Sequence, residues 1–422
     1  MKNYPHSKFK LILIIFIIYI IAVVISEQFY REYLFKKSIK IETDIYNKTS
    51  KKLITFFKII TKFGTVLFLI PLLIIIHITL PINISYTFLS VLILSAYYDN
   101  ILKIIYSSPR PFWIKTSIKN ECDGGFGNPS GHSFSSFSVF LSLWNILIEN
   151  IKPFQNQFCR IFLFFIFFSF AFLIALSRIF LCVHSINQIL YGGLLGFGLY
   201  FYFFHIIKLH KYSGKKFFKY ISDSKYIKMH SVKYFIYVII LLLVYFFRKS
   251  NWKEYDNLLT EKCPNIPLYR KFNNDGLFIG LSLFLLIGAH YGLYFFIIRI
   301  QVDKPFKNEE INNWSLENNL KFIFYKLLIA IIHCLPMIFY LVIPDNFSLA
   351  IIYPIKTILP FLLTGILLNG TYFYLCIKYK IAYKQIYVNY RIGTEAENNN
   401  SMSSIAIEVK IRDSNEINNL NK

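Results

Sequence analysis

Residues 160–207 read RIFLFFIFFSFAFLIALSRIFLCVHSINQILYGGLLGFGLYFYFFHII, two strongly apolar blocks joined by a short polar seam. Each block is about as long as a membrane-spanning helix, and similar blocks recur along most of the chain. The chain has 422 residues, of which 55% are hydrophobic, 19% aromatic and only 16% charged. These features predict an all-α fold, a polytopic membrane helical bundle.

The apolar blocks predict nine core transmembrane helices, at residues 61–80, 84–106, 132–148, 160–177, 184–207, 232–247, 276–298, 320–343 and 350–375. An earlier apolar run, residues 11–25, is either a signal anchor or a cleaved signal peptide. We therefore expect three parts: an N-terminal apolar segment and polar loop at 1–58, a membrane domain at 59–377, and a disordered cytoplasmic tail at 378–422.

The formal net charge of +23 arises from lysines that cluster between the apolar blocks. This pattern indicates membrane orientation, and no nucleic-acid-binding motif accompanies it. The segment 208–231 holds seven lysines against one aspartate, which predicts a cytoplasmic loop. Counting spans from it places the loops at 107–130, 178–184 and 248–275 on the opposite face, and the C-terminal tail in the cytoplasm. Lysine-rich residues 26–58 are the exception, because they fall on the noncytoplasmic face.

The seam carries Arg178 and His184. Alone, the arginine would be an interfacial anchor and the histidine a structural residue with its hydrogen bonds satisfied. Together, a guanidinium and an imidazole six positions apart can hold a phosphate, provided that other segments supply further partners.

Two further cations, Lys103 and Arg110, fall on the same face of the membrane. Arg110 follows Lys103 by seven positions, and two side chains seven residues apart on a helix point in nearly the same direction. Pro109 and Pro111, however, must end the helix near Ser107. Either cation alone would be an interfacial anchor. Asp99, one turn before Lys103, is placed to pair with that lysine and orient it.

The same loop ends in Ser130-Gly131-His132, directly before an apolar block. Ser130 suits a helix N-cap, and Gly131 permits close approach of the backbone to a ligand. A helix N-terminus presents free N–H groups, which favour an anion. His132 would lie in the first turn beside that anion.

Lys103 and Arg110, then Ser130-Gly131-His132, then Arg178 and His184 follow one another in an order that resembles the three-part signature of the type 2 phosphatidic acid phosphatase superfamily. Members of that superfamily hydrolyse phosphoesters through a phosphohistidine, without a metal or other cofactor. The signature spans residues 103–188.

Within the superfamily, the chain resembles the glucose-6-phosphatase branch. Gln188 stands where most lipid phosphatases carry an aspartate, and Arg110-Pro111-Phe112-Trp113 matches the branch's Arg-Pro-aromatic-Trp run. The nine spans and a long loop with Trp252 and Cys263 fit as well. The resemblance implies an endoplasmic reticulum membrane protein with a lumenal active site, a sugar phosphate substrate and a sugar-phosphate transporter as partner. The run at 11–25 has no counterpart in that branch.

The resemblance implies the following roles. His184 is the nucleophile and His132 the general acid and base. Three cations and two backbone N–H groups bind the phosphoryl oxygens, namely Lys103, Arg110, Arg178, Ser130 and Gly131. Gln188 orients the nucleophilic imidazole, as Asp99 orients its lysine.

Two other readings compete with hydrolysis of glucose 6-phosphate. The same catalytic set serves a phosphatase of lipid phosphates or polyprenyl diphosphates, and a catalytically silent membrane protein could bind an anion. Outside the signature motifs themselves, Cys122 and Cys263 fall on one noncytoplasmic face, which favours a disulfide. His77, His290 and His333 are expected to be structural, and Lys356 to face the bundle interior, with the active-site chamber as one option. Residues Cys159, Cys182, Cys334 and Cys376 serve as small hydrophobes.

Overall fold

A computed structural model describes residues 6–80, 82–115, 122–207, 224–248, 253–303, 316–345 and 347–379, and these contain helices and no strands. The α-helices are α1 (His6–Lys48), α2 (Lys51–Lys62), α3 (Val66–Thr79), α4 (Ile82–Tyr106), α5 (Pro111–Ile114), α6 (Gly131–Asn150), α7 (Gln157–Phe180), α8 (Ile186–Phe201), α11 (Ser224–Phe247), α12 (Lys253–Lys262), α13 (Phe272–Gly280), α14 (Leu283–Asp303), α15 (Leu316–His333), α16 (Ile338–Val342), α17 (Leu349–Ile352), α18 (Leu359–Ile366) and α19 (Tyr372–Lys378). Short 3-10 segments are η1 (Lys152–Gln155), η3 (Leu268–Arg270) and η4 (Leu335–Met337), and π-helical segments are η2 (Tyr202–Ile207), η5 (Tyr353–Ile358) and η6 (Leu367–Thr371).

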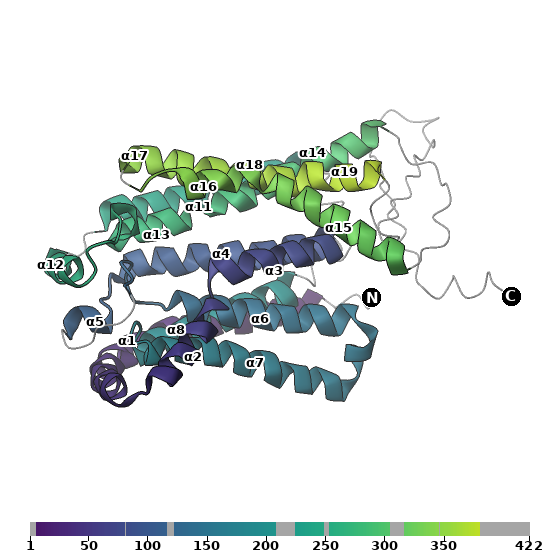
Figure 1. Cartoon of the computed structure of the whole chain (residues 1–422). Helices are drawn as coiled ribbons and strands as arrows, with labels where there is room; N and C mark the ends of the chain where they lie inside the picture. Colours follow the sequence, from purple (N-terminus) through teal and green to yellow (C-terminus); the bar gives the residue numbers. More distant parts are fainter. Residues whose placement is uncertain are drawn as a thin grey trace.

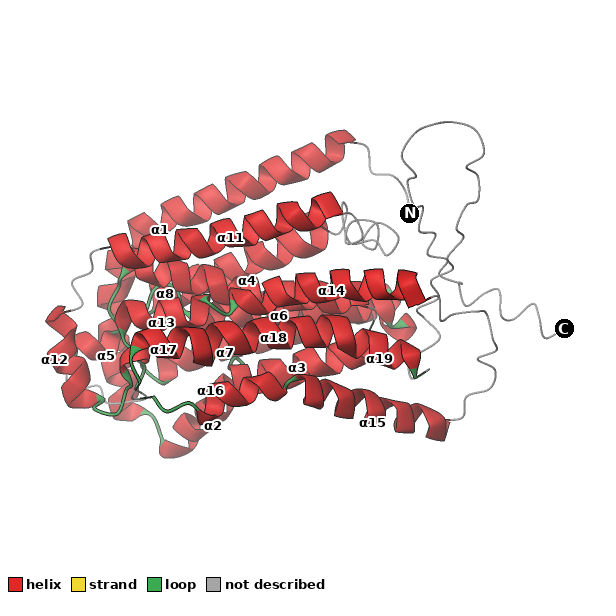
Figure 2. Cartoon of the chain, turned by 90° about the horizontal axis from the view of Figure 1, so that it is seen from above, coloured by secondary structure: helices red, strands yellow, loops and turns green. Residues whose placement is uncertain are grey.

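Helix α4 is the central element of the bundle. It contacts α6 and α8 on one side and α13, α14 and α11 on the other, and Figure 1 shows it between these two groups. Its side chains are buried around most of the helix circumference, as expected for a helix surrounded by others. Helices α6, α7 and α8 pack on one another in the first group, whereas α14 packs on α18 and η6 in the second. Figure 2 shows the long helices running in broadly the same direction.

Six helical segments of the described chain are long and apolar enough to cross a membrane, and a seventh is obtained if α2 and α3, bent by 41°, form one span. The nine predicted core spans all coincide at least in part with helices. Helix α6 is less apolar because five serines lie along it, and α8 has only 16 residues before η2. Nine core spans therefore remain a prediction. The predicted cytoplasmic loop at 208–231 falls mainly outside the described residues. Trp252 and the C-terminal tail after residue 379 also lie outside them.

The N-terminal region differs from the expectation. Residues 26–58 do not form a polar loop, because α1 is one helix of 43 residues and α2 begins three residues after it. No glycine or proline interrupts residues 26–48, and opposite charges one turn apart support the helix. Arg31 Nε donates to Glu27 Oε1 at 2.7 Å, and Lys36 Nζ lies 3.1 Å from Glu32 Oε1. The lysines that conflicted with the orientation rule are therefore carried by helices.

The intramembrane histidines make structural contacts. His77 is buried, with Nδ1 2.7 Å from Ser85 Oγ and Nε2 2.9 Å from the Leu368 carbonyl. His290 Nδ1 lies 3.4 Å from Tyr86 Oη, and His333 Nδ1 lies 2.7 Å from the Ile329 carbonyl. None of these contacts involves a residue of the predicted site.

Lys356 is buried, as expected, but its contacts lie away from the signature. It forms an ion pair with Asp345, and its Nζ lies 5.1 Å from the centre of the Tyr269 ring. Tyr269 Oη donates to the same aspartate at 3.0 Å. None of these partners is a residue of the predicted site, and the option that Lys356 faces the active-site chamber remains a prediction.

Candidate active site

The predicted site residues come together at the end of the bundle that carries α5 and α12 (Figure 1). They come from four places: the last two turns of α4 and the segment after it, the N-cap and first turn of α6, the last turn of α7, and the loop into α8 with the first turn of that helix. All four segments are ends of helices or short loops at one face. The set comprises Asp99, Lys103, Arg110, Ser130, Gly131, His132, Arg178, His184 and Gln188.

Arg110 is the most highly connected residue of the site. It is 1% exposed and lies just after α4, which ends at Tyr106, and it is the N-cap residue of α5. Its Nε donates to the Gly125 carbonyl at 2.6 Å, and its Nη1 donates to the Val183 carbonyl at 3.1 Å. The same Nη1 lies 2.9 Å from Nε2 of His184. A single guanidinium thus links the loop before α6 to the loop before α8.

An aromatic cluster holds the carbonyl groups that bind Arg110. Trp113 is fully buried, and its ring lies 6.0 Å from that of Phe126 and 5.4 Å from that of Phe272. Val183 belongs to the same cluster. The Arg-Pro-Phe-Trp run therefore supplies both the cation and part of the packing that positions it.

The protonation of His184 follows from its partners. Arginine can only donate, so Nε2 of His184 is an acceptor and carries a lone pair. The proton is then on Nδ1, which donates to the Gly127 carbonyl at 2.9 Å. Burial and the charges of Arg110 and Arg178 lower the pKa of His184 well below its usual value. The residue is therefore a neutral imidazole with its lone pair on the side of the arginine.

Gln188 contacts the imidazole as expected, but it is not the main acceptor. Its Oε1 lies 3.2 Å from His184 Nδ1, farther than the Gly127 carbonyl, and also accepts from the Ser185 N–H at 3.2 Å. That second bond completes a capping box with Ser185 as the N-cap of α8. The Nε2 of Gln188 donates to the Pro109 carbonyl at 2.8 Å. The amide thus orients His184 and ties α8 to the segment that carries Arg110.

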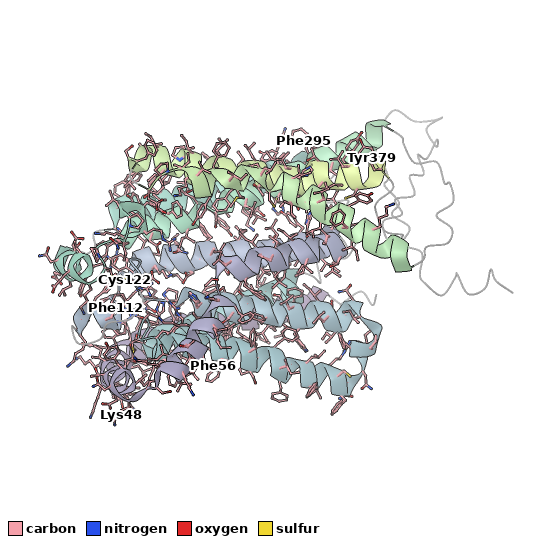
Figure 3. All side chains as sticks on the ribbon, viewed as in Figure 1. Lys48, Phe56, Phe112, Cys122, Phe295 and Tyr379 are labelled. Atoms are coloured by element: carbon pink, nitrogen blue, oxygen red, sulfur yellow. A yellow bond between two sulfur atoms is a disulfide. The ribbon has the colours of Figure 1, made fainter. Side chains whose placement is uncertain are left out.

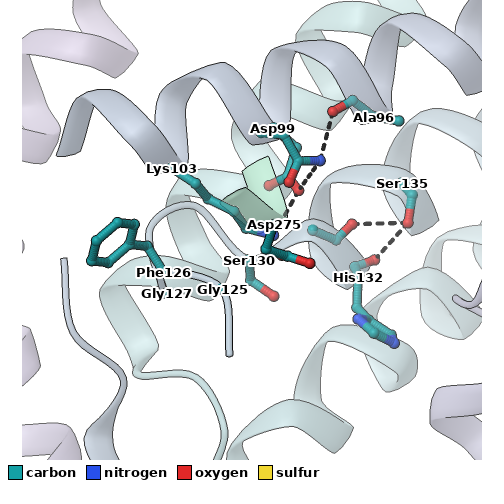
Figure 4. Close-up of polar contacts among 12 residues, drawn as sticks. Ala96, Asp99, Lys103, Gly125, Phe126, Gly127, Ser130, His132, Ser135 and Asp275 are labelled. Atoms are coloured by element: carbon teal, nitrogen blue, oxygen red, sulfur yellow. Dashed lines mark hydrogen bonds and ion pairs between the residues drawn. The ribbon is translucent and has the colours of Figure 1, made fainter. Parts of the chain in front are cut away.

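Lys103 and Asp99 form the predicted ion pair, one helical turn apart on α4, with 2.8 Å between Nζ and Oδ2 (Figure 4). Both side chains are buried. A Cβ at Gly131 would lie 2.6 Å from Asp99 Oδ2 and 3.2 Å from Lys103 Nζ. The start of α6 thus lies close to the ion pair, and a side chain at this position would displace it. The approach of Gly131 to a ligand remains a prediction.

Ser130 is the N-cap residue of α6, but its side chain makes no capping hydrogen bond. Its backbone N–H donates to the Gln188 carbonyl at 2.9 Å, so in this structure that group is directed at the protein and not at an anion. His132 follows in the first turn, and its ring points away from Asp99 in Figure 4. Its Nε2 is buried and has no hydrogen-bond partner among the described residues.

Arg178 lies in the last turn of α7 and is 3% exposed. Its Nη1 donates to Thr61 Oγ1 at 2.8 Å, a partner on α2 that no sequence pattern indicated. Lys103, Arg110 and Arg178 all act electrostatically on both His132 and His184. We call these three cations the anion site.

Asp123 is the charged residue that the sequence reading missed. Its Oδ2 lies 2.9 Å from Arg110 Nη2 and 4.0 Å from Arg178 Nη2. Burial raises the pKa of Asp123, but Arg110, Lys103 and Arg178 lower it below its usual range, so the carboxylate is charged. Its position next to Cys122, in the loop that leads to Ser130, was the one available signal.

The disulfide between Cys122 and Cys263 is confirmed, with 2.05 Å between the sulfur atoms. It joins the loop before α6 to the residue after α12, and Figure 3 shows Cys122 at the same end of the molecule as α12. The Phe272 N–H donates to the Gly124 carbonyl at 2.8 Å. The loop that carries Asp123 is therefore fixed on both sides of that residue.

Comparison with known proteins matches the segment that carries the site. Residues 85–212 match the model of the PAP2 superfamily. A structural match is the crystal structure of the first transmembrane PAP2 type phosphatidylglycerolphosphate phosphatase from Bacillus subtilis, at 20% sequence identity and a TM-score of 0.41, covering 46% of this chain and 97% of that one. The search of curated proteins gave no match. The segment that supplies all nine predicted site residues is a PAP2 superfamily domain.

Proposed function

We propose that this protein is a membrane phosphatase that transfers a phosphoryl group to Nε2 of His184. The observation that carries the proposal is the lone pair on that atom, defined by Arg110 on one side of the ring and by the Gly127 carbonyl on the other. A neutral imidazole with a fixed tautomer is the form that attacks phosphorus. The N–P bond forms as the P–O bond of the ester breaks.

His132 is proposed as the acid and base. Its Nε2 is buried and has no partner among the described residues, so in the protonated form it can donate its proton to the leaving oxygen and become neutral. After the alcohol departs, the neutral imidazole takes a proton from water as the water oxygen attacks the phosphohistidine. Inorganic phosphate leaves, and both histidines return to their starting states.

The anion site supplies the charge stabilisation. Three buried cations facing the developing negative charge contribute most where water is excluded. Guanidinium groups can also bind two phosphoryl oxygens at once. The Gly131 N–H at the start of α6 remains a proposed fourth donor, whereas Ser130 would have to release the Gln188 carbonyl to act in the same way.

Glucose 6-phosphate is the substrate that we favour. The support is the neutral Gln188 beside the nucleophile, the Arg110-Pro111-Phe112-Trp113 run, and a disulfide-linked loop over the site. A disulfide fits an oxidising compartment, in line with a lumenal site in the endoplasmic reticulum membrane and a cytoplasmic C-terminus. A sugar-phosphate transporter as partner belongs to the same proposal.

The test is phosphate release from glucose 6-phosphate and from phosphatidic acid by purified protein. We expect the sugar phosphate to be the better substrate and both His184→Ala and His132→Ala to abolish release. Faster hydrolysis of phosphatidic acid would assign the protein to the lipid phosphates. Undiminished hydrolysis by the His184 variant would eliminate the mechanism, and no hydrolysis of any phosphoester would leave an anion-binding protein.

A further inference from the structure

The carboxylate of Asp123 and the imidazole of His184 share one cation. The guanidinium of Arg110 contacts His184 through Nη1 at 2.9 Å and Asp123 through Nη2 at 2.9 Å. The two terminal nitrogens of a guanidinium are adjacent, so the carboxylate and the imidazole bind neighbouring positions of the same group. The Nη2 of Arg178 is 4.0 Å from Asp123 Oδ2.

The exposure of these side chains differs. The side chain of Asp123 is 27% exposed, against 1% for Arg110 and 4% for Arg178. Of the three side chains, that of Asp123 is therefore the most open to the surface.

The backbone holds Asp123 in this position. Cys122 is bonded to Cys263, and the carbonyl of Gly124 accepts from Phe272. A group that the chain holds next to a site has a high effective concentration there. The Asp123 carboxylate can therefore occupy the anion site even though a carboxylate anion in solution would not.

Resting on the proposed function, we propose that Asp123 is a specificity-determining residue: an internal anion that fills the anion site until a phosphoryl group displaces it. A phosphoryl dianion carries two charges and three oxygens, whereas the carboxylate carries one charge and two oxygens. The dianion therefore displaces Asp123, and singly charged anions do not. The residue excludes weak anions from His184 at the expense of affinity for the substrate.

The experiment is isothermal titration calorimetry on the full-length protein in detergent at pH 8. Inorganic phosphate and acetate are titrated separately, and the affinity for each anion is measured. Asp123→Asn should bind phosphate at least about tenfold more tightly, because removal of a like charge from the site favours the incoming anion. Acetate should bind measurably to this variant and not to the parent protein. The matched control is Asp256→Asn, a 41% exposed carboxylate of α12 that pairs with Lys271 outside the site, and it should change neither affinity.

Unchanged or weaker phosphate binding by a folded Asp123→Asn protein would overturn the inference, since it would make the carboxylate a support for the arginines. If that variant does not fold, Asp123→Ala carries the same prediction. Binding is measured without turnover, so the result is independent of whether glucose 6-phosphate or any other ester is hydrolysed. If the parent protein hydrolysed no phosphoester, that result would instead contradict the proposed function.

Discussion

Two acceptors share the Nδ1 proton of His184, the Gly127 carbonyl at 2.9 Å and Gln188 Oε1 at 3.2 Å. The sequence indicated Gln188 as an acceptor, because it lies one helical turn after His184. It could not indicate the Gly127 carbonyl, which is 57 residues away and belongs to the backbone that every residue type has. The histidines and the cations were predictable because the chemistry demands those side chains. Asp123 and Thr61 were not, because any loop carboxylate or hydroxyl could have met the arginines.

Gln188→Leu should reduce turnover by only about fivefold, because the Gly127 carbonyl still orients the ring and only one of the three lost hydrogen bonds, worth about 1 kcal/mol, reaches the imidazole. Loss of the bonds to Ser185 and Pro109 should lower the free energy of unfolding instead. Initial rates with saturating substrate measure the effect. Gln155→Leu, in η1 beyond the far end of α6, is the control and should have no effect. A loss of more than about a thousandfold, comparable to removal of a general base, would show that the glutamine carries the orienting role alone.

Helix α1 contacts both loops that carry the catalytic candidates. Glu27 is fully buried, and its Oε1 accepts from Asn128 Nδ2 at 2.8 Å in the loop before α6. Ser38 Oγ accepts from the Ile186 N–H at 2.9 Å, at the first residue of α8. The apolar run at 11–25 and the mixed charges at 26–58 predicted an anchor followed by a loop. The prediction of a loop was wrong because the local sequence pattern shows neither where a helix ends nor which distant residues it contacts. These contacts make α1 part of the site's support.

Ser38→Ala should lower the free energy of unfolding by about 1–3 kcal/mol, because the half-buried Ile186 N–H loses its acceptor. Activity should fall with it, since that N–H lies two residues after His184. Thermal unfolding and phosphate release together measure the effect. Ser26→Ala is the matched control, since among the described residues the Ser26 hydroxyl donates to the Val23 carbonyl of the same helix. Equal behaviour of the two variants would contradict a role for α1 in holding the loop.

At the scale of the whole molecule, the disulfide links the segments on the two sides of α4. The all-helical class and the positions of the helices follow from apolar blocks, and the pairing of Cys122 with Cys263 follows from two cysteines on one face. The arrangement of two helix groups around α4 does not follow, because polar residues such as Asp99 and Lys103 lie on a central helix. Packing between groups depends on contacts that are distant in the chain.

Joint replacement of Cys122 and Cys263 by serine should lower stability by about 2–5 kcal/mol, as expected for a native cross-link that closes a long loop. The midpoint of thermal unfolding in nonreducing buffer measures the change. Cys159→Ser, which removes a free cysteine of α7, should leave the midpoint unchanged. Equal midpoints for the parent and the double variant would mean that the cross-link contributes nothing to the folded state.

The central claim is that His184 carries the phosphoryl group, and acid quenching of the reaction with phosphorus-32-labelled substrate tests it most directly. Glucose 6-phosphate and phosphatidic acid are used in parallel, so that the outcome does not depend on the substrate. We expect an acid-labile, base-stable label on the peptide that contains His184, and no label in His184→Ala. Label on another residue, or hydrolysis without any trapped label and undiminished in His184→Ala, would contradict the account.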